Sequence, residues 1–278
     1  MSSTQFQVGC ELNYNVASQG AFIFNVSVIN NGFQRIVTES FVTEPPLPVF
    51  ESRSPVEEKR HHRFLAQPGL LKVRYSAKVE LMHHRQLPEL VPQVAPGDLP
   101  SEVLPYLYPS RYCESDKLTR LTQHEFGKYP PGFTQVTAIC NYLRDNIEYL
   151  RGSTSPSTSA YDTVTERAGV CRDFAHLAIA FCRALSIPAR FVSGYVINLE
   201  PPDFHAYFEA YLGGRWYIFD PTRLSPQTSF VRIGTGRDAA DTSFATIFGA
   251  VQFTSMKVIM EYIDGAPPEF TTDAISTS

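Results

Sequence analysis

The first 87 residues alternate between apolar and polar positions in the way that is typical of β-strands. In the stretch 72–81 (KVRYSAKVEL), every second residue is apolar and those between are charged or polar. A period of two with one polar face predicts a strand of an antiparallel sheet whose other face is buried. Residues 22–29 and 37–43 are predicted to form two more strands, and Asn-Asn-Gly at 30–32 predicts a turn after the first. We therefore expect residues 1–87 to form a β-rich domain.

Six prolines between residues 88 and 109 separate this region from a helical one. Prolines at this density exclude a regular helix and predict an extended linker over residues 88–110. The second domain is expected to comprise residues 111–278. Its first three helices are predicted at 115–127, after Pro130-Pro131, and at 161–167. The last eight residues, TTDAISTS, are predicted to be a frayed tail.

A strongly apolar helix is predicted to begin at Cys171. From Phe174 to Leu185, apolar residues recur at i, i+3, i+4, i+7, i+8 and i+11, and Pro188 marks the end. The start of a helix has unpaired N–H groups and partial positive charge, which stabilise a thiolate. The main-chain N–H of Cys171 would also point at an oxyanion formed beside the sulfur. From its position alone, however, Cys171 could equally be a buried thiol.

Two strands after this helix bring a histidine and an aspartate together. They are joined by Gly213-Gly214, a pair typical of a tight hairpin turn. If the loop has two residues, His205 lies on the same face as Asp220, one diagonal step away and within side-chain reach.

Cys171, His205 and Asp220 make up the set that thiol nucleophilic catalysis needs. Cys171 would attack a carbonyl, and His205 would take the thiol proton and return it to the leaving group. Asp220 would hold the imidazole tautomer and stabilise its charged form. Each residue alone has an ordinary structural explanation, but their order and shared face together favour catalysis.

The segments GVCRDFAHLAIAFCRALSIPARFVSGYV and HAYFEAYLGGRWYIFDPT resemble the transglutaminase-like superfamily, and most closely its bacterial branch of transglutaminase-like cysteine proteases. The resemblance is strong over about residues 115–263 and weaker over 1–85. It implies an α+β fold, in which a papain-like core with a central helix packed on an antiparallel sheet follows a small β-sandwich-like domain. The family's G-V-C, H-A-W and D-P-T motifs fall on Cys171, His205 and Asp220.

Two positions depart from the family pattern. Tyr207 stands where H-A-W usually has Trp, so substrate contacts beside the histidine are expected to differ. Arg172 stands where Gln is common, and its charge would favour a thiolate or select acidic groups. His176 lies elsewhere around the helix from Cys171 and is expected to be structural.

Composition limits the other possibilities. With 278 residues, 43% of them apolar, and a net charge of −4, the chain is globular and lacks the basic excess of a nucleic-acid-binding protein. No apolar run is long enough to span a membrane, and no secretory signal is visible at the N-terminus. The adjacent pairs His61-His62 and His83-His84 are expected to be surface histidines rather than metal ligands.

The five scattered cysteines predict free thiols in a reducing cytosol. Cys140 and Cys182 lie on apolar helical stripes and are expected to be packing residues. The absence of a C-x-x-C pair and of a D-x-[DN]-x-[DN]-G loop argues against zinc and calcium sites, and we expect no metal or cofactor.

Three functions remain open. The first and preferred one is a thiol peptidase or amidase, in which water resolves an acyl-enzyme at Cys171. The second is a transglutaminase-type acyltransferase, in which an amine resolves the same intermediate. The third is a binding or scaffold protein with a vestigial site. The expected partner is a peptide or protein amide substrate, with no nucleic acid or membrane partner, and the oligomeric state is left open.

Overall fold

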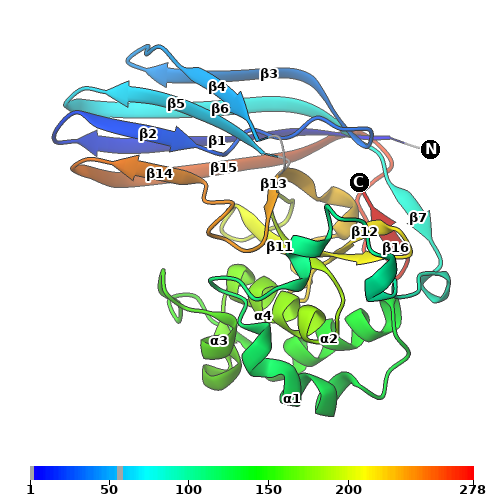
Figure 1. The fold of residues 1–278 in the computed structure, drawn as a ribbon. Helices are drawn as coiled ribbons and strands as arrows, with labels where there is room; N and C mark the ends of the chain where they lie inside the picture. The colour runs from blue at the N-terminus through cyan, green and yellow to red at the C-terminus, as the bar shows by residue number, and fades with distance from the viewer. Residues whose placement is uncertain (1–2, 55–58) are drawn as a thin grey trace.

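Two packed antiparallel sheets form one half of the molecule, and a domain of helices on a third sheet forms the other (Figure 1). The computed structural model describes residues 3–54 and 59–278. The sheets of the first half have the orders β15-β1-β6-β3 and β14-β2-β5-β4. Their strands are β1 (Thr4–Val16), β2 (Gly20–Phe24), β3 (Gln34–Glu44), β4 (Phe50–Arg53), β5 (Arg60–Ala66), β6 (Gly69–Leu81), β14 (Ala245–Phe248) and β15 (Val251–Gly265). The expected β-sandwich is therefore present.

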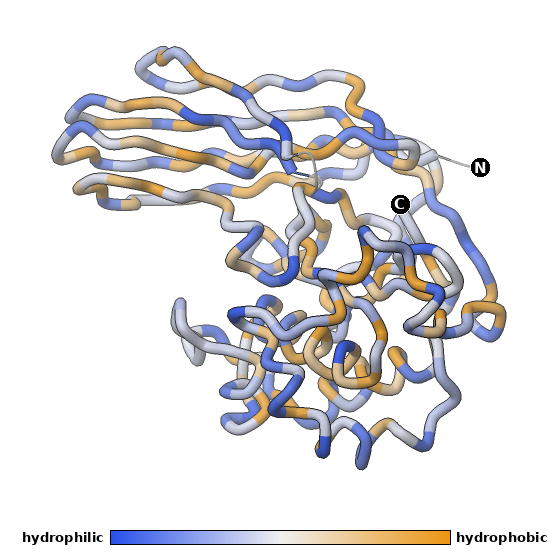
Figure 2. The backbone as a smooth tube through the Cα atoms, in the orientation of Figure 1, coloured by the Kyte–Doolittle hydropathy of each residue, from blue (hydrophilic) through white to orange (hydrophobic). Residues whose placement is uncertain are grey.

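The predicted alternation holds along β6, where Val73, Tyr75, Ala77 and Val79 are buried and the residues that alternate with them are more exposed. Figure 2 shows the same alternation of apolar and polar residues along the strands of the sandwich. The strand predicted over residues 22–29 is shorter in the structure, since β2 ends at Phe24. Beyond that point side chains satisfy the main chain, as the Tyr195 hydroxyl does when it donates to the Val26 carbonyl at 2.7 Å.

The predicted division of the chain at residue 111 is wrong for its C-terminal part. β15 pairs with β1 along its whole length, and β14 pairs with β2. Residues 245–265 therefore belong to the sandwich, although they follow the second domain in the sequence. Long-range pairing of this kind leaves no local signal, because the partner strand lies more than 200 residues away.

Residues 88–110 contain no α-helix, as predicted, but they pack on the second domain rather than spanning a gap. They form three short 3₁₀ turns, η1 (Pro88–Leu90), η2 (Pro96–Asp98) and η3 (Leu104–Leu107). Val91 and Tyr106 are buried, and the Gly213 N–H donates to the Pro92 carbonyl at 2.8 Å. The segment thus covers part of the hydrophobic core of the second domain.

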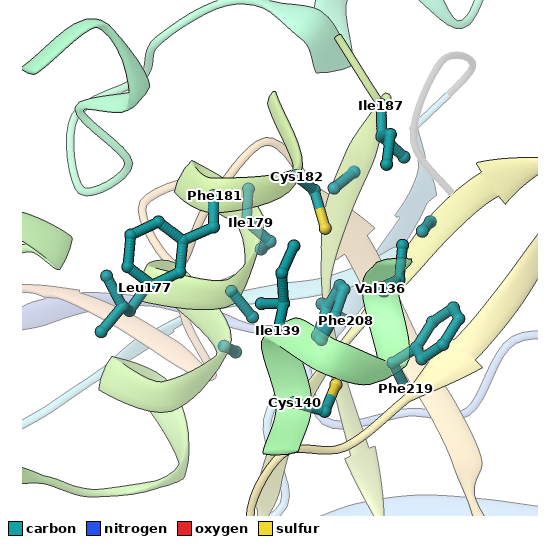
Figure 3. Packing of buried hydrophobic residues seen from close by; sticks show 14 of the residues in the cluster. Val136, Ile139, Cys140, Leu177, Ile179, Phe181, Cys182, Ile187, Phe208 and Phe219 are labelled. Carbon is teal, nitrogen blue, oxygen red and sulfur yellow. The ribbon is translucent and has the colours of Figure 1, made fainter. Parts of the chain in front are cut away.

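The second domain packs four helices on a sheet of order β12-β11-β10-β13. Its elements are α1 (Ser115–Phe126), α2 (Phe133–Asn146), β8 (Glu148–Tyr149), α3 (Ala160–Glu166), β9 (Ala168–Gly169), α4 (Cys171–Ala184), β10 (Ala189–Tyr195), β11 (His205–Leu212), β12 (Arg215–Phe219), η4 (Gln227–Ser229) and β13 (Val231–Gly236). Figure 3 shows Cys140 and Cys182 among the apolar side chains between α2, α4 and the sheet, so both are packing residues as expected.

The C-terminal residues are buried, and the predicted frayed tail is wrong. Strand β16 (Ala274–Ser276) pairs with β7 (His84–Gln86), and Ile275 is 2% exposed. The Thr277 hydroxyl accepts a hydrogen bond from Arg232 at 3.0 Å. Polar composition suggested a solvated end, but an available strand edge and a buried guanidinium hold it in place.

The histidine pairs differ from expectation at His62, which is buried, stacked on Phe41 at 4.1 Å and within 2.7 Å of the Ser27 hydroxyl. No helix among residues 3–54 and 59–278 is long and apolar enough to cross a membrane.

Candidate active site

Cys171 is the first residue of α4, a helix that is buried along nearly its whole length. The preceding Val170 is extended, and the Asp173 carboxylate accepts a hydrogen bond from its main-chain N–H at 2.9 Å. This contact fixes the helix start, where the first N–H groups have no intrahelical partner. Of the five cysteines, Cys171 alone is not fully buried. Its thiol therefore lies at the part-exposed, electropositive end of a buried helix.

The neighbouring residue Tyr149 was not identified from the sequence. β8 and β9 pair in parallel, which sets Tyr149 beside Gly169, two residues before Cys171. Burial and the charge of Cys171 raise the pKa of Tyr149. A hydrogen bond with the Cys171 main chain lowers it, but the net result is a pKa of about 12. Its hydroxyl group thus lies beside the start of α4. A two-residue parallel pairing has no sequence pattern that would have revealed this contact.

His205 and Asp220 meet in the predicted way. β11 and β12 pair in the register of a two-residue turn, with Leu212 opposite Arg215. The His205 ring Nε2 lies 2.9 Å from Asp220 Oδ2, and both side chains are only 1% exposed. The main-chain N–H and the hydroxyl of Thr222 donate to Asp220 Oδ1 at 2.9 and 2.8 Å, which orients the carboxylate.

The charge state of His205 follows from this pairing. Burial by itself lowers the pKa of His205, but the charge and hydrogen bond of Asp220, together with those of Cys171, raise it to about 10. Ring atom Nδ1 forms no hydrogen bond with a nitrogen or oxygen atom within the described part of the chain, so it is the nitrogen that remains for the Cys171 thiol. The structure thus brings Cys171, His205 and Asp220 together, with the imidazolium favoured between two acidic groups.

The other four thiols are buried in the interior. Burial raises the pKa of Cys10 and of Cys113 to about 12, and it also raises the pKa of Cys140 and Cys182. These thiols stay protonated and inaccessible, so a thiolate-directed reagent meets Cys171 alone.

The two departures from the family pattern have structural explanations. The Arg172 guanidinium is held by Asp173 at 3.1 Å and by the Ser155 carbonyl at 2.6 Å, so it ties the 151–159 loop to the helix start. Tyr207 is fully buried with its ring 4.6 Å from that of Phe230, so it packs beneath the site instead of contacting a substrate.

Two further expectations concern structural and metal-binding roles. His176 is buried, accepts a hydrogen bond from the Ala239 N–H at 3.1 Å and stacks on Tyr112, which agrees with the predicted structural role. Among the described residues, no group of three or more His, Cys, Asp and Glu side chains could hold a metal ion.

A cavity of about 650 Å³ has Asp220 in its lining. Its walls include Phe219, Arg223 and the C-terminal segment around Phe270, but neither Cys171 nor His205. This cavity therefore borders the Asp220 carboxylate but not the thiol.

Comparison with known proteins matches both halves of the chain. A family model described as the transglutaminase-like superfamily matches residues 119–221, and one described as the bacterial transglutaminase N-terminal domain matches residues 4–95. A crystal structure named "Putative Cysteine Protease from Cytophaga hutchinsonii" is 43% identical, with a TM-score of 0.95. The match covers 99% of this chain and 98% of that one. The likeness thus extends over the whole fold.

Curated relatives match over a shorter stretch. An uncharacterised protein of Mycobacterium leprae is 32% identical over 136 residues, which are 45% of this chain and 48% of that protein. One of Mycobacterium tuberculosis strain H37Rv is 35% identical over 134 residues, 40% of this chain and 42% of that protein. The aligned region thus spans about half the length of the curated relatives or less.

We predict that an iodoacetamide-type reagent labels Cys171 selectively in the folded protein near neutral pH, because the other thiols are buried and protonated. Peptide mapping by mass spectrometry after a timed exposure measures this. His205→Ala is expected to slow the labelling, whereas Cys182→Ala leaves it unchanged. Equal labelling of a buried cysteine without unfolding contradicts the prediction.

We also predict that Asp220→Asn changes how stability depends on pH. Because the folded pKa of His205 is raised from 6.5 to about 10, its protonation stabilises the fold fully below pH 6.5, and this contribution is lost as the pH rises through 10. The free energy of unfolding of the wild type should therefore exceed that of Asp220→Asn most near about pH 6, and the difference should shrink towards pH 10.

Urea unfolding at several pH values measures the difference. Asp264→Asn, at an exposed position on β15, is the matched control and should show a difference from the wild type that does not follow this pH window. A gap that stays constant between pH 6 and 10 for Asp220→Asn contradicts the assigned pairing.

Proposed function

Because this chain belongs to the transglutaminase-like superfamily, we propose that it is a cysteine-dependent enzyme that hydrolyses peptide or amide bonds. Cys171, His205 and Asp220 are the proposed catalytic residues. The observation that carries the proposal is the part-exposed thiol at the start of α4, beside a buried histidine that Asp220 holds at 2.9 Å. These are the groups that thiol catalysis requires.

The first half of the reaction forms a thioester. The Cys171 thiolate attacks the carbonyl carbon, a C–S bond forms, and the carbonyl oxygen takes up the negative charge. As the C–N bond breaks, the His205 imidazolium gives its proton to the leaving amine. Because the pKa of His205 is raised, the ring still carries that proton near neutral pH when the amine leaves.

The second half releases the acyl group. A water molecule attacks the thioester carbonyl while neutral His205 takes one of its protons. The C–S bond then breaks, the acid product leaves, and the thiolate and imidazolium are restored. Asp220 keeps the ring oriented through both halves, because Thr222 holds the carboxylate from the other side.

The oxyanion needs donors that are already in position. The main-chain N–H of Cys171 is one, since it lies at the helix start, and a bound substrate would take this donor over from the Tyr149 oxygen. The Tyr149 hydroxyl is proposed as the second, because it lies next to the Cys171 main chain and burial keeps it protonated. The short pairing of β8 with β9 holds both donors in one rigid unit.

Acyl transfer to an amine is the second candidate. The match of residues 4–95 to a bacterial transglutaminase N-terminal domain supports it. Both reactions share the thioester, and they differ only in whether water or an amine attacks it.

The cytosol remains the predicted location, supported by the five free cysteines.

The test compares the wild type with Cys171→Ala on peptide amides, with and without an added primary amine. We expect the wild type to release free acid product and Cys171→Ala to release none above background. Mass spectrometry of the products measures both outcomes. A product that forms only with the amine favours acyl transfer, and equal products from the two proteins reject an enzymatic role for Cys171.

We predict that Tyr149→Phe lowers kcat by about 10²-fold with little change in KM, because a lost oxyanion donor acts on the transition state alone. Steady-state kinetics measure this split. Tyr161→Phe, which removes a hydroxyl from an exposed position on α3, is the matched control and should keep full activity. A wild-type kcat in Tyr149→Phe rejects the second donor.

A further inference from the structure

An acidic residue lies immediately before the proposed catalytic histidine. Asp203 is the last residue of the 196–203 loop, which joins β10 to β11, and it precedes His205 by two positions. The Phe204 ring between them stacks on Phe244 at 4.2 Å and packs in the core of the sandwich. The charge of His205 acts on the Asp203 carboxyl. Asp203 and His205 are therefore neighbours, while Phe204 anchors the chain between them.

The charge of Asp203 also reaches Tyr149. Burial and the charge of Cys171 have larger effects on the pKa of Tyr149, and the charge of Asp203 raises it further. Tyr149 interacts with the Cys171 main chain, and His205 interacts with the Cys171 thiol. Asp203 thus acts on both groups that contact Cys171. Its carboxylate belongs to the immediate surroundings of the proposed nucleophile.

The Asp203 carboxylate has no bonded counter-ion. The residue is exposed, its Oδ1 accepts a hydrogen bond from the Phe204 N–H at 2.7 Å, and it forms no ion pair in the described part of the chain. Burial of the carboxyl raises the pKa of Asp203, and the Phe204 hydrogen bond and the charges of Arg151 and His205 offset this only in part. Arg151 itself donates to the Glu200 carbonyl at 2.9 Å. The carboxylate can therefore still gain from a cation that arrives with a ligand.

The arginine next to the nucleophile is already engaged. The Arg172 guanidinium is bound by the Asp173 carboxylate at 3.1 Å and by the Ser155 carbonyl at 2.6 Å. Ion pairing and a second acceptor leave this side chain little to offer an anionic substrate. Asp203 differs, because its carboxylate is exposed and has no such partner. The charges beside Cys171 therefore favour a cationic ligand over an anionic one.

The position of Asp203 also indicates which half of the substrate it meets. His205 gives its proton to the leaving amine, so the amine half of the scissile amide lies on the His205 side of the thiol. An amine that attacks the thioester arrives at the same place, because its reaction is the reverse of the step that expels the leaving amine. Asp203, as the neighbour of His205, lies on this side.

We propose that Asp203 is a specificity residue that selects substrates with a cationic group, such as a lysine side chain, on the amine half of the scissile amide. This inference rests on the proposed function. The ammonium group would form a charge-assisted hydrogen bond with the Asp203 carboxylate while His205 protonates the departing nitrogen. The same preference applies to an entering amine in acyl transfer.

The substrate test uses three peptides that differ only in the residue after the scissile amide, which is lysine, its uncharged counterpart norleucine, or glutamate. We expect kcat/KM of the wild type to be about tenfold higher for the lysine peptide than for the norleucine peptide, and lowest for the glutamate peptide. Lysine amide and norleucine amide, added as acyl acceptors, give the same comparison for acyl transfer. A preference for lysine in either assay assigns the cation to that reaction, and equal values in both assays overturn the proposal.

Three variants assign the preference to one carboxylate. Asp203→Asn removes the charge and should abolish the preference for lysine, whereas Asp203→Glu keeps the charge and should retain it. Asp264→Asn, which removes an exposed carboxylate of β15, is the matched control and should keep the wild-type preference. If Asp203→Asn prefers lysine as strongly as the wild type does, the assignment to Asp203 is wrong.

Thiol reagents of opposite charge separate this proposal from the proposed function, because labelling of Cys171 needs no turnover. Aminoethyl methanethiosulfonate is cationic and sulfonatoethyl methanethiosulfonate is anionic, and both carry the same reactive group. We expect Asp203→Asn to lower the ratio of the cationic to the anionic labelling rate about fivefold, because the carboxylate attracts one reagent and repels the other. Neutral iodoacetamide shows that Cys171 stays reactive in each variant.

The labelling ratio decides the role of Asp203 even if the protein cleaves no peptide. A ratio that falls in Asp203→Asn but not in Asp264→Asn supports the cation site, and a lack of hydrolysis then rejects only the proposed function. A ratio that is the same in the wild type and in Asp203→Asn overturns the proposal, whether or not the wild type hydrolyses amides.

Discussion

The two-residue turn at Gly213-Gly214 is the constraint on which the candidate site depends. Both glycines have positive φ, 55° and 85°, a conformation that matches the twist of paired strands and that other residues adopt poorly. The turn fixes the register of β11 and β12, so His205 and Asp220 lie on one face. A slip of one residue would put them on opposite faces of the sheet, and α4 would then present Cys171 to the wrong side chains.

Burial acts in opposite ways on the titratable groups of this chain. It raises the pKa of four thiols and keeps them inert in the core. It would lower the pKa of His205 as well, but Asp220 and Cys171 more than offset it. A low-dielectric interior thus suppresses the ionisation of the four cysteines that only pack. It also strengthens the interaction of His205 with Asp220, which orients the imidazole. Cys171 differs from these thiols in its exposure, because the helix start brings it to the surface of that interior.

Local patterns predicted much of this molecule, and long-range contacts account for what they missed. The stripe of α4, the alternation of β6 and the hairpin register depend on residues close in sequence, so periodicity and turn chemistry reveal them. β15, the buried tail at Ile275 and the contact of Tyr149 depend on partners far along the chain. Their own sequences are compatible with several environments, and only the completed sheets select one of them.

The sandwich is part of the site because it holds the chain that enters β11. The Tyr195 hydroxyl donates to the Val26 carbonyl at 2.7 Å, and the Phe204 ring stacks on Phe244 at 4.2 Å. These contacts anchor both ends of the 196–203 loop in the core of the sandwich, immediately before His205. The imidazole is therefore positioned by Asp220 on one side and by the sandwich behind it. Since β15 belongs to the sandwich and comes last among its strands, residues that follow His205 in the sequence also help to build the core that anchors this loop.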